Sequence, residues 1–144
     1  MLKGIPKVIS PELIKILMEM GHGDEIVIAD GNFPSASMAK RLVRCDGLNV
    51  PEVLDAILKL FPLDTKYSPK AVFLMEVVPG DTVKTPIWEE YRQIIQKHTS
   101  EFNEFANIER FAFYEAAKNA YAVIATSEKA LYANVILRKG VVID

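Results

Sequence analysis

Short runs of aliphatic and β-branched residues alternate with amphipathic helical segments along this chain of 144 residues. Strands are expected at Glu25–Ala29, Leu42–Cys45, Ala71–Val78, Tyr121–Thr126 and Asn134–Leu137, with a further extended segment at Phe105–Phe111. Helices are expected at Pro11–Met20, Pro51–Phe61, Thr85–Lys97 and Tyr114–Asn119, with a helical turn at Glu128–Leu131. This alternation predicts an α/β fold with three α/β/α layers and a mainly parallel sheet, in a single domain of residues 1–144.

The stretch Gly21–Pro34, with the sequence GHGDEIVIADGNFP, carries polar residues at both ends of its apolar run. Gly21 follows the last apolar residue of the first helix and is expected to end that helix in the left-handed conformation. His22 follows it, and Asp30 comes directly after the strand. Eight extended residues at roughly 3.3 Å each would separate the two side chains by about 26 Å. They can share a site only if the chain folds back or if they come from different subunits.

His22 is the candidate for proton transfer, because an imidazole with an unperturbed pKa of about 6.5 can donate or accept a proton near neutral pH. The glycines on both sides of it leave the ring unobstructed. The alternative interpretation is a solvated loop histidine, and Asp30 alone is equally typical of a turn. Composition and spacing do not decide between these interpretations.

Arg110 lies in an otherwise apolar stretch, and its forked donors suit a carboxylate or the neighbouring hydroxyls of a sugar as well as a structural ion pair. The segment Tyr132-Ala133-Asn134 offers a phenol and an amide just before a strand, although turn formation explains it equally well. Trp88 and Tyr91 are typical of helix packing, but an aromatic face could also contact the apolar side of a sugar.

The sequence lacks the features that are typical of several classes of protein. The net charge of −2 gives no general argument for a nucleic acid or membrane partner, and no apolar run approaches the roughly 20 residues of a membrane span. The single cysteine, Cys45, excludes an internal disulfide, and without a hydrophobic signal core we expect a cytoplasmic protein.

Motifs for phosphate binding and serine hydrolysis are also missing from the chain. The residues His22, Asp24, Asp30 and His98 lack the close spacing of metal ligands, so no metal site is expected.

The chain resembles the fucose mutarotase branch of the ribose pyranase/fucose mutarotase family. The matching segments cover nearly the whole chain in order: LKGIPKVISPELIKILMEMGHGDEIVIADGNFP, RCDGLNVPEVLDAILKLFPLD, TPIWEEY, IERFAFYEAAKNAYAVIAT and LYANVILRKGV. The combination of GHGDEIVIAD with the later RFAFYE and YAN motifs is specific. Tyr114 stands where the ribose branch tends to have a histidine, which favours the fucose branch.

The resemblance implies interconversion of the α and β anomers of L-fucose without a cofactor, in a homo-oligomer that in this family is commonly a decamer. It implies that His22 is the proton donor and that the sugar-binding positions are Asp30, Arg110, Tyr114 and Tyr132-Ala133-Asn134. The methyl group of L-fucose calls for an apolar wall, for which the candidates are Trp88 and Phe113. Two alternatives stay open: a mutarotase of another sugar, such as D-ribose or D-galactose, and a non-catalytic sugar-binding module.

Overall fold

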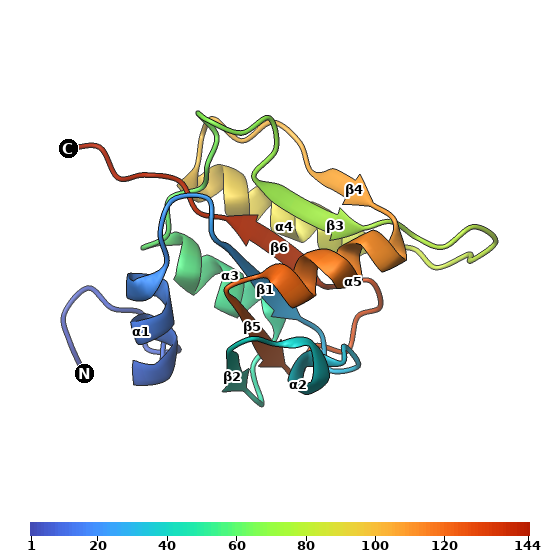
Figure 1. The fold of residues 1–144 in the computed structure, drawn as a ribbon, viewed down its shortest axis with the longest axis horizontal. Coiled ribbons are helices and arrows are strands. Elements are labelled where there is room, and N and C mark those ends of the chain that lie inside the picture. The colour runs from blue at the N-terminus through green and yellow to red at the C-terminus, as the bar shows by residue number, and fades with distance from the viewer.

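The computed structural model describes all of residues 1–144 and contains one six-stranded sheet (Figure 1). The strands are β1 (Glu25–Ala29), β2 (Leu42–Cys45), β3 (Val72–Met75), β4 (Ala106–Ile108), β5 (Ala122–Thr126) and β6 (Val135–Arg138). They lie in the order β2-β5-β1-β6-β3-β4. β6 is antiparallel to both of its neighbours, whereas the other pairs are parallel. The prediction of a mainly parallel sheet is confirmed, with β6 as the exception.

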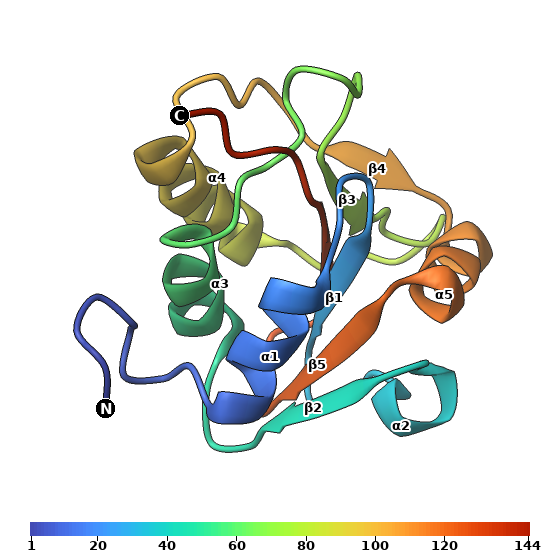
Figure 2. The ribbon, with the colours of Figure 1, turned by 60° about the vertical axis from the view of Figure 1, so that its left-hand side comes forward.

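Helices cover both faces of the sheet, as Figure 2 shows. They are α1 (Pro11–Glu19), α2 (Ser35–Met38), α3 (Val50–Leu58), α4 (Pro86–His98) and α5 (Arg110–Asn119). Helices α1, α3 and α4 pack on one face, and α2 and α5 pack on the other. The predicted three-layer α/β/α arrangement is therefore confirmed. None of these helices combines the length and apolar character needed to cross a membrane.

Strand β1 is buried on both faces of the sheet, which explains its uninterrupted apolar sequence. Successive side chains of a strand point to opposite faces, so Ile26 and Ile28 join the larger core under α1, α3 and α4. Val27 and Ala29 instead join the smaller core under α5. The rigid centre of the sheet thus fixes the direction in which the loops before and after β1 emerge.

The first helix begins where the sequence predicts. The Ser10 side chain accepts a hydrogen bond from the Leu13 N–H at 3.1 Å, and Pro11 occupies the first helical turn. The expected end of this helix needs correction, because Gly21 is not left-handed and Met20 caps the helix in an extended conformation. The left-handed residue is Gly23, with φ of 86°, so the turn falls after His22 instead of before it.

Two further expectations were wrong. The extended segment over Phe105–Phe111 ends early, and α5 begins at Arg110, because the Glu109 carboxylate accepts backbone N–H groups of the first helical turn. The segment Glu128–Leu131 is not helical. There the Glu128 carboxylate accepts the N–H groups of the next two residues and holds the chain in an irregular connection.

The strand directions give the sheet two functionally different ends. The carboxyl end is the one at which the five parallel strands finish, and it carries Asp30 after β1 and Arg110 after β4. Asn134 joins them because the antiparallel β6 begins at this end. The amino end is the opposite one, and it carries His22 before β1 and Asp64 before β3.

Candidate functional site

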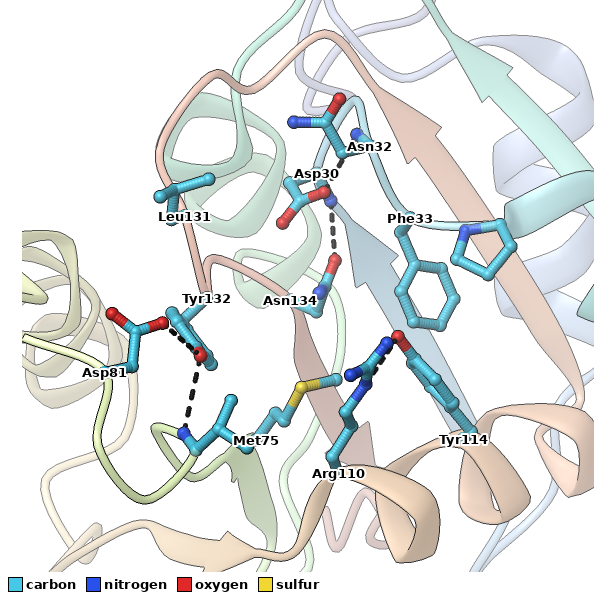
Figure 3. Close-up of a pocket in the computed structure, with 12 residues that line it drawn as sticks. Asp30, Asn32, Phe33, Met75, Asp81, Arg110, Tyr114, Leu131, Tyr132 and Asn134 are labelled. Atoms are coloured by element: carbon cyan, nitrogen blue, oxygen red, sulfur yellow. Dashed lines mark hydrogen bonds between the residues drawn. The ribbon is translucent and has the colours of Figure 1, made fainter. Parts of the chain in front are cut away.

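A cavity of about 300 Å³ opens at the carboxyl end of the sheet (Figure 3). Its walls come from the loops after β1 and β3, the first turns of α5 and the connection before β6. The lining residues are Asp30, Asn32, Phe33, Pro34, Met75, Val78, Asp81, Arg110, Tyr114, Leu131, Tyr132 and Asn134. Ligands of α/β proteins bind at this end of a parallel sheet, since the loops that follow the strands converge there. Among the sequence-predicted positions, Asp30, Arg110, Tyr114, Tyr132 and Asn134 line this one cavity.

Asp30 is the buried carboxylate of this cavity, with 7% of its surface exposed. Its Oδ1 accepts the Asn32 N–H at 2.9 Å. Burial raises the pKa of this carboxyl above its usual value, although hydrogen bonds from the backbone N–H groups of Asn32, Phe33 and Ala133 oppose the shift. No cation pairs with it, so Asp30 takes up a proton more readily than an exposed aspartate does.

Asn134 is oriented by the backbone of Asp30. The Asp30 N–H donates to the Asn134 Oδ1 at 2.8 Å, which fixes the side-chain oxygen toward the strand and leaves the amide nitrogen for the cavity. The adjacent backbone is also held, since the Tyr91 hydroxyl donates to the Ala133 carbonyl at 2.7 Å. Ala133 is fully buried and does not line the cavity, and its backbone N–H donates a hydrogen bond to the Asp30 carboxylate.

Arg110 contributes an unpaired cation from the first position of α5. Its Nε donates to the Tyr114 hydroxyl at 3.3 Å, and its guanidinium lies over the rings of Phe111 and Tyr114. It forms no salt bridge with any carboxylate of the chain. The remaining donors of the fork are therefore free for the oxygen atoms of a ligand.

Tyr132 adopts a left-handed conformation, with φ of 56°, that is uncommon for a residue with a side chain. Its hydroxyl donates to the Asp81 Oδ2 at 2.8 Å and accepts the Val78 N–H at 3.3 Å. The hydrogen bond to Asp81 raises the pKa of the Tyr132 phenol, which therefore stays a neutral hydroxyl at physiological pH. These contacts also join the long β3–α4 loop to the cavity wall.

Trp88 does not line the cavity, which fits the interpretation of this residue as helix packing. Its indole N–H donates to the Tyr132 carbonyl at 2.7 Å, and the ring packs against the larger core instead of lining the cavity. Phe113 is fully buried in the smaller core. The apolar wall of the cavity comes instead from four other side chains, those of Phe33, Met75, Val78 and Leu131. Trp88 therefore supports the Tyr132 segment from behind.

His22 lies at the amino end, outside this cavity. Its Nε2 lies 3.1 Å from the Asp64 Oδ2, and its ring meets the edge of Tyr67 with 5.2 Å between ring centroids. The side chain is 42% exposed. Strand β1 thus separates His22 from Asp30 within one chain, as the strand geometry predicts. No group of three or more His, Cys, Asp or Glu side chains is arranged to hold a metal ion.

Sequence reasoning missed several of the residues in these two regions. Asn32 and Asp81 line the cavity and Asp64 contacts His22, but all three lie in loop or turn sequences and carry no functional prediction. The available signal was their place directly beside the strand ends, where α/β proteins gather polar groups. Met75 carried no such signal, since the last residue of a buried strand is ordinarily part of the core.

An α/β protein with a polar cavity at the carboxyl ends of its parallel strands belongs to the class that binds small molecules. A model of the "RbsD / FucU transport protein family" matches residues 3–142, and the chain belongs to this family. It is 52% identical over 147 residues to a fucose mutarotase of Danio rerio, covering 98% of this chain and 94% of that one.

Two solved structures are similar over nearly their full length. A fucose mutarotase from Streptococcus pneumoniae in complex with L-fucose is 54% identical, with a TM-score of 0.91 and coverage of 99% of this chain and 100% of that one. FucU from Bifidobacterium longum is 58% identical, with a TM-score of 0.94 and coverage of 98% and 100%. The match therefore includes both the sheet and the loops that form the cavity.

Proposed function

We propose that this chain interconverts the α and β anomers of L-fucose and is thus a carbohydrate isomerase. The observation that carries the proposal is the cavity, in which a buried carboxylate, an unpaired guanidinium, a phenol and an amide face an apolar wall. Such a set can hold the hydroxyls of a sugar and its methyl group at the same time. The similar protein from Streptococcus pneumoniae was solved with L-fucose bound.

The reaction needs two proton transfers. Ring opening breaks the bond between the anomeric carbon and the ring oxygen, whose electron pair stays on that oxygen and takes a proton from an acid. The anomeric hydroxyl loses its proton to a base and becomes the aldehyde carbonyl. Rotation about the adjacent carbon–carbon bond exposes the other carbonyl face, and closure returns both protons. The cycle neither gains nor loses electrons.

We assign the acid to His22 and the base to Asp30. Asp30 is suited to the base because its raised pKa makes it a better proton acceptor than an exposed aspartate. Arg110, Tyr114, Tyr132 and Asn134 are assigned to the sugar hydroxyls, since their polar side chains line the same cavity. Ala133 contributes its backbone.

His22 is proposed to act in the cavity of a neighbouring subunit. The sheet holds His22 and Asp30 at opposite ends, so the two side chains can meet only across a contact between two copies of the chain. We therefore propose a homo-oligomer, and the family resemblance favours a decamer. The single domain of residues 1–144 would be its repeating unit, and a cytoplasmic location fits the buried, unpaired Cys45.

Saturation-transfer NMR on L-fucose tests the proposal directly. Saturation of the anomeric proton of one anomer should transfer to that of the other far faster with the protein than in buffer. His22→Ala should reduce the rate of this exchange by about 10²–10⁴-fold. His98→Ala is the control, because it removes the other histidine of the chain, which contacts Asp55 and has no role in the proposed reaction. Binding of L-fucose without faster exchange would identify a non-catalytic sugar-binding protein, and parallel runs with D-ribose and D-galactose measure the sugar preference.

A further inference from the structure

The backbone on both sides of Asp30 is bound to one short segment, Thr126–Glu128, at the end of β5. On one side the Thr126 hydroxyl donates to the Ala29 carbonyl at 2.7 Å. On the other side the Gly31 N–H donates to the Glu128 carbonyl at 2.9 Å. Asp30 therefore sits between two hydrogen bonds that join the loop after β1 to the chain after β5.

Both of these contacts are closely packed. Thr126 is only 4% exposed, so its hydrogen bond to Ala29 is shielded from water. A Cβ at Gly31 would lie 3.2 Å from the Glu128 carbonyl oxygen, which is tighter than ordinary van der Waals contact. The position of Asp30 thus follows the position of the Thr126–Glu128 segment.

The Thr126–Glu128 segment is itself anchored on its far side, by the loop between β2 and α3. The Ser127 N–H donates to the Leu48 carbonyl at 2.9 Å, and the Ser127 hydroxyl oxygen accepts the Gly47 N–H at 2.7 Å. Within the segment, the Thr126 hydroxyl oxygen also accepts the Glu128 N–H at 3.2 Å. The Thr126 hydroxyl therefore links this anchored segment directly to the strand that precedes Asp30.

Glu128 also carries a negative charge close to Asp30. Its carboxylate accepts the N–H groups of Val50 at 3.3 Å, Lys129 at 2.9 Å and Ala130 at 3.1 Å, and it forms no salt bridge. Burial is the main cause of the raised pKa of Asp30, and repulsion from Glu128 adds to it. Glu128 thus affects both the position and the proton affinity of Asp30.

Other titratable groups around Asp30 come from different elements and are not altered by a change at Glu128. They are Asp81, Tyr91, Arg110, Tyr114 and Tyr132. Thr126 and Glu128 are not among the residues that line the cavity, so a bound sugar contacts neither of them. Any influence of these two residues on the reaction has to pass through Asp30.

We propose that Thr126 and Glu128 are the positioning residues of Asp30: their two hydrogen bonds fix its carboxylate at the reacting position in the cavity, and Glu128 keeps a second negative charge behind it. This inference rests on the proposed function, in which Asp30 is the base. It assigns to the end of β5 the task of holding that base ready for the proton of the anomeric hydroxyl.

The first test separates the Thr126 hydroxyl from the packing of its side chain. Thr126→Val keeps the shape but removes the hydroxyl from Ala29 and Glu128. We expect kcat to fall by about 10–100-fold, since a small displacement of a reacting group can cost this much. KM should stay close to wild type, because Arg110 and Asn134 still face the sugar. Thr126→Ser keeps the hydroxyl and should recover most of the lost kcat. Wild-type kcat in Thr126→Val, or equal losses in both variants, would overturn the role of Thr126.

The second test changes only the charge of a partly exposed side chain. Glu128→Gln keeps the backbone carbonyl that binds Gly31. The carboxyl of Asp30 is titrated by ¹³C NMR in protein labelled at its aspartates, and Asp30→Asn assigns the signal. Because one cause of the raised pKa is removed, the midpoint should move to lower pH in Glu128→Gln, and the acid limb of the kcat–pH profile should move with it. An unchanged midpoint would overturn the role of Glu128.

Glu52→Gln is the matched control. The Glu52 carboxylate accepts the Asn49 N–H at 2.8 Å at the same end of α3, but it makes no contribution to the pKa of Asp30. This variant should keep the wild-type kcat and the wild-type midpoint. The proposed function fails separately, because in that case Asp30→Asn would exchange anomers as fast as wild type. An inactive Asp30→Asn with fully active Thr126→Val and an unchanged midpoint in Glu128→Gln removes only the present inference.

Discussion

Asp30 and Asp64 are both buried aspartates in loops beside the sheet, but their surroundings differ at the two ends. Asp30 receives only backbone hydrogen bonds, and burial raises its pKa. Asp64 receives a hydroxyl, a backbone N–H and an imidazole, and these hydrogen bonds lower its pKa despite burial. The same side chain is thereby prepared to accept a proton at the carboxyl end and to stay charged at the amino end.

The comparison also explains why one chain cannot form the proposed site alone. β1 connects the two ends as a fully extended, buried strand, paired with β5 on one side and β6 on the other. Neither a loop movement nor a side-chain rotation brings His22 to Asp30 across that sheet. The two ends complement each other only when one copy of the chain contacts another.

The largest expected effect is at Asp30. Replacing it in Asp30→Asn removes the proposed base and should lower the exchange rate by about 10²–10⁴-fold. Because burial disfavours the charge of Asp30, the melting temperature should stay the same or rise. Asp55→Asn serves as a control for both measurements. A wild-type exchange rate in Asp30→Asn would show that Asp30 is not the base of the reaction.

A smaller effect is expected at Arg110, whose guanidinium has no carboxylate partner. Arg110→Ala should raise KM for L-fucose by about 10–100-fold, since a hydrogen bond to a charged group contributes about 1.5–3 kcal/mol. Arg110→Lys keeps the charge but loses the fork, and it should fall between Ala and wild type. Exchange rates measured over a range of L-fucose concentrations give KM and kcat. If Arg110→Ala lowered only kcat, Arg110 would act in the proton transfers instead of in sugar binding.

Tyr132→Phe should raise KM for L-fucose by a smaller factor, about fivefold. The lost hydrogen bond would join two neutral hydroxyls, those of Tyr132 and the sugar, and such a bond contributes about 1 kcal/mol. The variant removes the hydroxyl that joins Asp81 and the Val78 N–H. Faster amide hydrogen exchange at Val78 would accompany the loss if this hydroxyl holds the loop. Unchanged hydrogen exchange there would mean that other contacts fix the loop.

The smallest effect concerns acid stability. The pKa of Asp64 is lowered in the folded state, so its contribution to the free energy of unfolding is present above the unfolded pKa of about 3.9 and is lost as pH falls through the folded value. Asp30 has the opposite sign, since its raised pKa favours folding at low pH. Urea unfolding between neutral and acid pH should show a shallower acid loss in Asp64→Asn than in wild type, and a steeper one in Asp30→Asn.

The sequence was sufficient for the parts of the fold that depend on local patterns. The β-branched run of Glu25–Ala29 predicted β1, and Ser10 with Pro11 predicted the start of α1. The start of α5 was wrong because Glu109 is not a common capping residue, and because the phenylalanines around Arg110 imitate the alternation of a strand.

Some residues of the candidate site could likewise be predicted from local sequence, and others could not. Asp30 could be named because it directly follows a strand, and the cavity confirms that it lies beside Asn134, although 104 residues separate them in the sequence. Asp64 could not be named, because its contact with His22 spans 42 residues and nothing near it in the sequence indicates a partner. The sequence left Trp88 open between helix packing and a sugar contact, because an aromatic residue on a helix face has the same pattern whether it packs behind a site or lines it.

Co-expression of two inactive variants is the most direct measurement of the central claim, which is that the amino end of one chain completes the carboxyl end of another. Chains carrying His22→Ala and chains carrying Asp30→Asn are produced together, purified as mixed oligomers through different tags, and assayed for L-fucose anomer exchange. Random assembly should restore about a quarter of wild-type activity, since one site in four combines an intact His22 with an intact Asp30. Mixed oligomers that stay as inactive as either variant alone would contradict the account.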